Sequence, residues 1–155
     1  MEALSYFFSS EFRVYYEDTD SGGVVYYANY LKFAERARTE ALREQGVNQS
    51  ELKEQTGLFF IVKSCNINFV KPARLDDVLI VKTLFKKVAQ TSTIVVQHIY
   101  TKNLLLAEIE VVLVCVKEND DKKILPFRLP NELATKLRGK KEHPDLVKIK
   151  NKINS

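Results

Sequence analysis

Apolar and small residues recur at helical spacing between residues 30 and 41. Those at i, i+3, i+4, i+7 and i+11 are Tyr30, Phe33, Ala34, Ala37 and Ala41, which lie on one face of an α-helix. Charged and polar residues fill the opposite face, and Gly46 is a typical residue for the end of a helix. The pattern predicts one long helix, and the alanines on its apolar stripe indicate close packing against a flat partner.

Much of the remaining chain has the pattern of β-strands. A first strand is predicted at Phe12–Tyr16. Four longer runs, separated by turn signals, follow the helix: Phe59–Val70, Asp77–Val88, Thr91–Thr101 and Leu104–Lys117. A short strand is expected at Lys123–Phe127, and a short helix at Asn131–Leu137. This order predicts an α+β fold in which one long helix covers a curved antiparallel sheet.

Length and composition favour a single cytoplasmic domain. The chain has 155 residues, of which 45% are hydrophobic and 28% charged, as in ordinary soluble proteins. The N-terminus carries Glu2 where a secretory signal has basic residues, and the longest apolar run, Val111–Val116, is too short to span a membrane. We therefore expect a soluble, cytoplasmic protein.

The composition changes at the C-terminus. We predict a folded domain over residues 1–137 and a basic tail over residues 138–155. The tail contains six basic and two acidic residues, and the net charge of the whole chain is +4. A solvated tail is the simplest interpretation. The alternative is contact with an acidic partner such as acyl carrier protein, or with an anionic membrane surface; nucleic acid is a less favoured partner.

Several kinds of chemistry find no support in the sequence. Cys65 and Cys115 each lie in an apolar run and are expected to be reduced. No group of residues has the spacing of metal ligands, so no metal is predicted. There is no Gly-x-Ser-x-Gly motif and no glycine-rich phosphate loop, and no cofactor is predicted.

The segment VYYEDTDSGGVVYYANY, residues 14–30, places acids, two glycines and a helix start close together. A plain surface turn is one interpretation. The other is a minimal acyl-transfer site, because a helix N-terminus offers unpaired N–H groups to an oxyanion and glycines let a ligand approach the backbone. No general acid is evident, which favours a thioester over an amide, since a thiol leaves readily as thiolate.

The stretch YEDTDSGGVVYYANYLKFAERARTE resembles the signature of the hotdog-fold acyl-CoA thioesterases. It is most similar to the Tol-Pal-associated branch (YbgC type) and is also similar to 4-hydroxybenzoyl-CoA thioesterase. Further matches are NINFVKPARLDDVLIV and AEIEVVLVCV, so that the resemblance extends from about Phe12 to Pro130. It implies a hotdog fold, hydrolysis of acyl-CoA with short-chain or small acyl groups, and edge-to-edge homodimers that commonly pair into tetramers.

The resemblance also assigns roles to residues of the acidic segment. It implies that Asp20 is the catalytic carboxylate and that the backbone N–H of Tyr27, at the start of the helix, polarises the thioester carbonyl. Gly23 matches the glycine of the turn, and Asp18 matches a supporting acid. The Tol-Pal-associated branch usually has histidine where this chain has Tyr27, whereas the 4-hydroxybenzoyl-CoA branch has tyrosine, so the exchange bears on substrate range and keeps the backbone donor.

Other assignments are less specific. Coenzyme A needs cations for its phosphates, and the candidates are Lys86, Lys87 and Arg128. Asp20 could act as a general base or as a nucleophile. The alternative to an enzyme is a non-catalytic module on the same fold that binds an acyl thioester or an acyl carrier protein.

Overall fold

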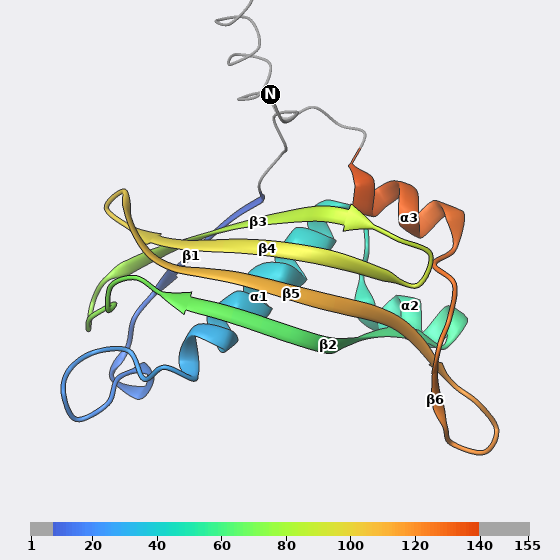
Figure 1. Cartoon of the computed structure of the whole chain (residues 1–155), viewed down its shortest axis with the longest axis horizontal. Coiled ribbons are helices and arrows are strands. Elements are labelled where there is room, and N and C mark those ends of the chain that lie inside the picture. The colour runs from blue at the N-terminus through green and yellow to red at the C-terminus, as the bar shows by residue number, and fades with distance from the viewer. Residues whose placement is uncertain (1–7, 140–155) are drawn as a thin grey trace, which may run out of the picture.

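A computed structural model describes residues 8–139 of the chain, and most of the predicted basic tail lies outside the described residues. The elements follow in the order β1 (Phe8–Arg13), α1 (Asn29–Glu44), α2 (Gln49–Thr56), β2 (Leu58–Phe69), β3 (Val78–Val88), β4 (Ser92–Thr101), β5 (Leu104–Glu118), β6 (Ile124–Pro126) and α3 (Asn131–Arg138). Figure 1 shows the strands as one broad layer with α1 lying across its inner face. The predicted α+β fold is confirmed.

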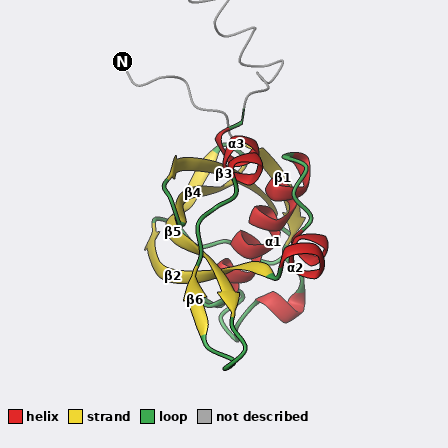
Figure 2. Cartoon of the chain, turned by 90° about the vertical axis from the view of Figure 1, so that its right-hand side faces the viewer, coloured by secondary structure: helices red, strands yellow, loops and turns green. Residues whose placement is uncertain are grey.

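The strands form one antiparallel sheet. Its order is β1-β3-β4-β5-β2, and β6 pairs with the end of β5. Seen from the end of the molecule, the sheet curves around α1 (Figure 2). Because β1 and β2 are the two outer strands of this order, each has one edge without a strand partner among the described residues.

The long helix packs against the sheet through the predicted stripe. Tyr30, Phe33, Ala34, Ala37 and Ala41 are all at most 3% exposed, and they join the inward residues of the strands in a single apolar core. Small side chains let α1 approach the sheet closely, as the sequence indicated. No described helix is long and apolar enough to cross a membrane.

The prediction of the first strand was wrong in its position. β1 ends at Arg13, opposite Val78, and residues Tyr16–Asp18 form a 3-10 turn. The physical reason is the Asp18 carboxylate, whose Oδ2 accepts a hydrogen bond from the N–H of Tyr15 at 2.8 Å. This local bond caps the turn and withdraws the chain from the sheet.

Helix α2 was not predicted. None of its residues is buried, so it has no apolar periodicity to recognise. The sequence features that mark this helix are its two capping residues. The Asn48 side chain accepts a hydrogen bond from Glu51 N–H at 3.2 Å at the first end, and Gly57 terminates the helix at the other. The structure also corrects the interpretation of Cys65, which is exposed on β2, whereas Cys115 is buried as expected; both thiols are free.

Candidate active site

The acidic segment forms a loop between β1 and α1 that is fastened at both ends. Val14 N–H donates to the Asp77 carbonyl at 2.9 Å, and Val25 N–H donates to the Ala73 carbonyl at 2.8 Å. An isolated antiparallel bridge joins Thr19 to Val25 across the loop. The loop therefore follows a defined path at one end of the molecule, on the left of Figure 1.

Asp20 has an exposed side chain within this loop. Its N–H donates to the Val24 carbonyl at 2.9 Å, and its carbonyl accepts from Gly23 N–H at 3.1 Å. Carboxylate oxygen Oδ1 accepts a hydrogen bond from Gly22 N–H at 2.8 Å, which forms an Asx turn. The backbone thus anchors one oxygen, and Oδ2 has no hydrogen-bond partner among residues 8–139.

The two glycines meet different requirements of this turn. Gly23 has φ +78°, in the left-handed region that side chains disfavour. Gly22 has no such φ, but a Cβ on it would lie 3.2 Å from Oδ1 of Asp20. Gly23 therefore suits the turn role expected for it, and Gly22 leaves room for the carboxylate.

Asp18 connects the loop to the start of α1. Its carbonyl oxygen accepts hydrogen bonds from Tyr26 N–H at 3.0 Å and from the side-chain amide of Asn29 at 2.9 Å. Its carboxylate holds the 3-10 turn through Tyr15. Asp18 thus ties the acidic loop to the start of α1, and its supporting role in catalysis stays a prediction. Asn29 was not predicted from the sequence, because its amide does not cap the helix and its partner lies eleven positions away in the chain.

Tyr27 lies two residues before α1, not within the helix. Asn29 N–H donates to the Tyr26 carbonyl at 2.8 Å, which closes a turn with Tyr27 and Ala28 at its centre. The N–H groups of central turn residues point away from the closing bond. Accordingly, the Tyr27 N–H has no acceptor within the described part of the chain and is available to a ligand.

The Tyr27 side chain is 64% exposed, and its ring meets that of Tyr26 edge-on at 4.9 Å. The neighbouring Tyr27 phenol raises the pKa of Tyr26. Below Tyr27, a pocket of about 260 Å³ lies between the start of α1 and the end of β2. It is lined by Val25, Tyr27, Tyr30, Phe69, Val70, Lys71 and Pro72.

The three cations expected to hold coenzyme A phosphates lie elsewhere. β3 begins beside the acidic loop, where Asp77 accepts a hydrogen bond from Val14, and it ends at Val88. A strand rises about 3.3 Å per residue, so Lys86 and Lys87 lie roughly 30 Å from Val78, the first residue of β3. Arg128 is at the same far end, because its neighbour Leu129 donates to the Gln90 carbonyl. Within one chain the structure therefore separates these cations from Asp20.

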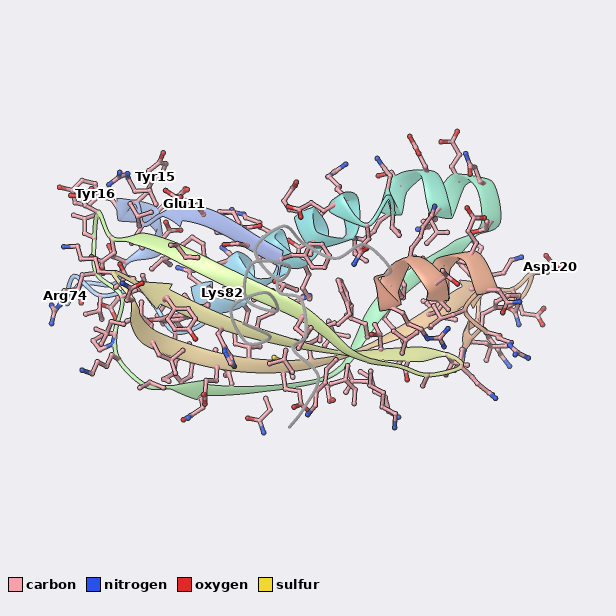
Figure 3. All side chains as sticks on the ribbon, turned by 90° about the horizontal axis from the view of Figure 1, so that it is seen from above. Glu11, Tyr15, Tyr16, Arg74, Lys82 and Asp120 are labelled. Carbon is pink, nitrogen blue, oxygen red and sulfur yellow. The ribbon has the colours of Figure 1, made fainter. Side chains whose placement is uncertain are left out.

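Cations closer to the acidic loop are found between β2 and β3. Lys71 lines the pocket beside Tyr27, and Arg74 forms a backbone bridge with Val24. Figure 3 shows Arg74 at the same end of the molecule as Tyr15 and Tyr16, opposite Asp120. The described residues contain no group of three or more His, Cys, Asp or Glu side chains that could hold a metal ion.

Comparison with known proteins identifies relatives over most of the chain. A family model described as the thioesterase-like superfamily matches residues 14–137. The acyl-CoA thioester hydrolase YbgC of Escherichia coli O6:H1 is 42% identical over 127 residues, which cover 81% of this chain and 92% of that protein. The acyl-CoA thioesterase YbgC of Haemophilus influenzae is 43% identical over 126 residues, covering 81% and 90%.

Solved structures agree with the fold. A probable thioesterase from Bartonella henselae has 37% identity and a TM-score of 0.74, covering 81% of this chain and all of its own. A mutant 4-hydroxybenzoyl CoA thioesterase in complex with 4-hydroxybenzoyl CoA has a TM-score of 0.79 at 21% identity, and the match covers 86% of this chain and 99% of that chain. At this identity the likeness supports only the shared hotdog fold. By its family match and its relatives, the chain belongs to the thioesterase-like superfamily.

Proposed function

We propose that the protein hydrolyses acyl-CoA thioesters to a free acid and coenzyme A. The observation that carries this proposal is the acidic loop, which holds the anchored carboxylate of Asp20 and the unpartnered N–H of Tyr27. The relatives at 42–43% identity are named for the same reaction. Family membership makes the reaction class the expected one, and the loop supplies its minimal chemistry.

In the proposed reaction, the thioester carbonyl accepts a hydrogen bond from Tyr27 N–H. This donor stabilises the negative charge that develops on the oxygen as the carbonyl carbon becomes tetrahedral. Asp20 either removes a proton from the attacking water or attacks the carbon itself, forming an anhydride that water then cleaves. In both routes the C–S bond breaks and coenzyme A leaves as thiolate, which needs no strong general acid.

The pocket beside Tyr27 is consistent with a small acyl group. Aromatic and aliphatic side chains provide most of its wall, including Tyr30 and Phe69, whose rings meet edge-on at 5.3 Å. Its mostly apolar lining supports an acyl group at this position, and a short-chain or small acyl group is the proposal. Tyr27 borders this space, which makes its exchange for histidine relevant to acyl preference.

We further propose that the enzyme is a homo-oligomer built on a dimer through β2. This edge strand exposes Ile61, Val62 and Phe69 by 40–50%, and Val70 follows with 46%. An exposed apolar edge favours association, and a second copy can cover it by a two-fold contact. The distant cations Lys86, Lys87 and Arg128 could then serve a thioester bound to another subunit.

A non-catalytic module that binds acyl thioesters or acyl carrier protein is the second candidate. The anchored carboxylate favours the enzyme, because a binder of a neutral thioester has no need of it. The basic tail, through which an anionic membrane or carrier protein would be contacted, lies outside the described residues. A cytoplasmic location stays a prediction from composition.

The test is thiol release from a panel of acyl-CoA substrates with short, branched, long and aromatic acyl groups. We expect turnover that is lowered at least ~100-fold by Asp20→Asn, the lower range for loss of acid–base catalysis. Binding of acyl-CoA without turnover would favour the second candidate. Turnover by Asp20→Asn at the wild-type rate would exclude the acidic loop as the site.

A further inference from the structure

Asn29 is one of the few polar side chains buried in the described part of the protein. It is the first residue of α1 and is 9% exposed. Its side-chain amide donates to the Asp18 carbonyl at 2.9 Å, and its backbone N–H donates to the Tyr26 carbonyl at 2.8 Å. One residue therefore closes the turn that presents Tyr27 and also ties that turn to the acidic loop.

The Asp18 carbonyl oxygen, which accepts the bond from the Asn29 amide, accepts a second hydrogen bond as well. The Asp18 carbonyl also accepts from Tyr26 N–H at 3.0 Å, so one donor from the turn before α1 and one from the first residue of α1 converge on one oxygen. Asp20 follows Asp18 by two residues, and Tyr27 precedes Asn29 by two residues. The Asn29 amide is thus a side-chain link between the segment that carries the carboxylate and the segment that carries the free N–H.

We propose that Asn29 is a positioning residue, which fixes Tyr27 N–H relative to the Asp20 carboxylate and does not itself touch substrate. This inference rests on the proposed function. An amide suits the task because it donates to a carbonyl and does not titrate. A carboxylate of the same shape cannot donate, and an alanine leaves the Asp18 carbonyl with one donor fewer.

The expected effect is on the chemical step. Misplacing reacting groups by about 1 Å through a residue outside the site can cost about 100-fold in rate. Asn29→Ala should therefore lower kcat by ~10–100-fold. The Michaelis constant should change less than ~3-fold, because Asn29 itself does not line the acyl pocket.

Thr101 provides a matched control. It is also 9% exposed, and its hydroxyl donates to a backbone carbonyl, that of Val78, at 3.0 Å. Neither partner belongs to the acidic loop or to the Tyr26–Asn29 turn. Thr101→Val should lower the melting temperature by an amount similar to Asn29→Ala and leave kcat within ~2-fold of the wild-type value.

The experiment measures kcat, KM and melting temperature for wild type, Asn29→Ala, Thr101→Val and Asp20→Asn with an acyl-CoA that the wild type hydrolyses. The expected result is that kcat falls in Asn29→Ala and stays near the wild-type value in Thr101→Val. Wild-type kcat in Asn29→Ala, or an equal fall in Thr101→Val, would overturn the positioning role. If Asn29→Ala does not fold, Asn29→Asp is measured instead, since aspartate is favourable at a helix N-terminus and lacks the donor.

The experiment distinguishes failure of the positioning role of Asn29 from failure of the proposed active site at Asp20. If Asp20→Asn is inactive and folded Asn29 variants are fully active, only the positioning role is wrong. If Asp20→Asn retains the wild-type rate, the proposed site is wrong and the positioning role fails with it.

Discussion

The hydroxyl oxygen of Tyr30 accepts a hydrogen bond from the backbone N–H of Ala73 at 2.9 Å. The Ala73 carbonyl in turn accepts from Val25 N–H at 2.8 Å. Tyr30 is on α1 and Ala73 follows β2, so this short chain of bonds joins the helix, the segment between β2 and β3, and the acidic loop. Both residues are buried, at 3% and 0% exposed.

Tyr30→Phe should destabilise the protein, because it leaves the buried N–H of Ala73 without an acceptor. A buried unsatisfied donor costs about 1–3 kcal/mol. The free energy of unfolding, measured by urea denaturation, should fall by that amount. Tyr100→Phe is the control, since its hydroxyl makes no hydrogen bond with the described residues and its ring is kept; an equal loss there would refute the account.

The same phenol predicts a pH dependence. Burial raises the pKa of Tyr30 above its ordinary value near 10. The neutral form therefore stabilises the fold fully below the unfolded pKa, and this contribution is lost as pH rises through the folded-state pKa. The stability difference between wild type and Tyr30→Phe should shrink above about pH 10; a difference that grows there would contradict the sign.

The glycine pair should separate stability from activity. Gly23→Ala forces a side chain into the left-handed region and should lower the free energy of unfolding by about 1–2 kcal/mol. Gly22→Ala should cost little stability but displace the Asp20 carboxylate by a few tenths of an ångström, lowering kcat by roughly 3–10-fold. Melting curves and thiol-release rates on both variants test this, and the reverse ranking would be evidence against it.

A buried polar network beneath α1 should show energetic coupling. Arg38 Nη1 donates to Gln97 Oε1 at 3.0 Å, and Gln97 Nε2 donates to the Ala34 carbonyl and to Thr83 Oγ1 at 2.8 and 2.9 Å. Burial lowers the pKa of Arg38, which indicates that its charge is poorly hydrated.

Gln97→Leu should therefore destabilise the protein by about 2–3 kcal/mol, because the guanidinium loses its acceptor. Arg38→Met in the same background should recover part of that loss. A double-mutant cycle by urea denaturation measures the coupling, and strictly additive effects would mean that the bond contributes nothing.

Local patterns in the sequence predicted most elements of the fold. The apolar stripe located α1, and the strands β2 to β5 were placed within one residue at each end, because both depend on periodicity. Helix α2 and the true limits of β1 escaped because side-chain caps, from Asn48 and Asp18, determine them. Such single contacts leave no periodic signal.

Some features of the candidate site could likewise be predicted from the sequence, and others could not. The turn around Asp20 is local, and its Asx and glycine signals are readable in five consecutive residues. The link from Asn29 to Asp18 spans eleven positions and appears only in three dimensions. The phosphate candidates Lys86 and Lys87 failed to join the site in one chain because strand length, which the sequence did predict, carries them away from it.

The final prediction distinguishes the backbone of Tyr27 from its side chain. Tyr27→Phe keeps the N–H and the ring, so hydrolysis should remain within ~3-fold of wild type. Tyr27→Pro removes the N–H at a turn position that accommodates proline, and loss of one oxyanion donor should lower kcat by ~100–1000-fold. Circular dichroism and melting temperature verify that the proline variant folds. If the phenol were the catalytic group, Tyr27→Phe would fall as far as Asp20→Asn, and the free N–H between Tyr26 and Ala28 would have no part in the reaction.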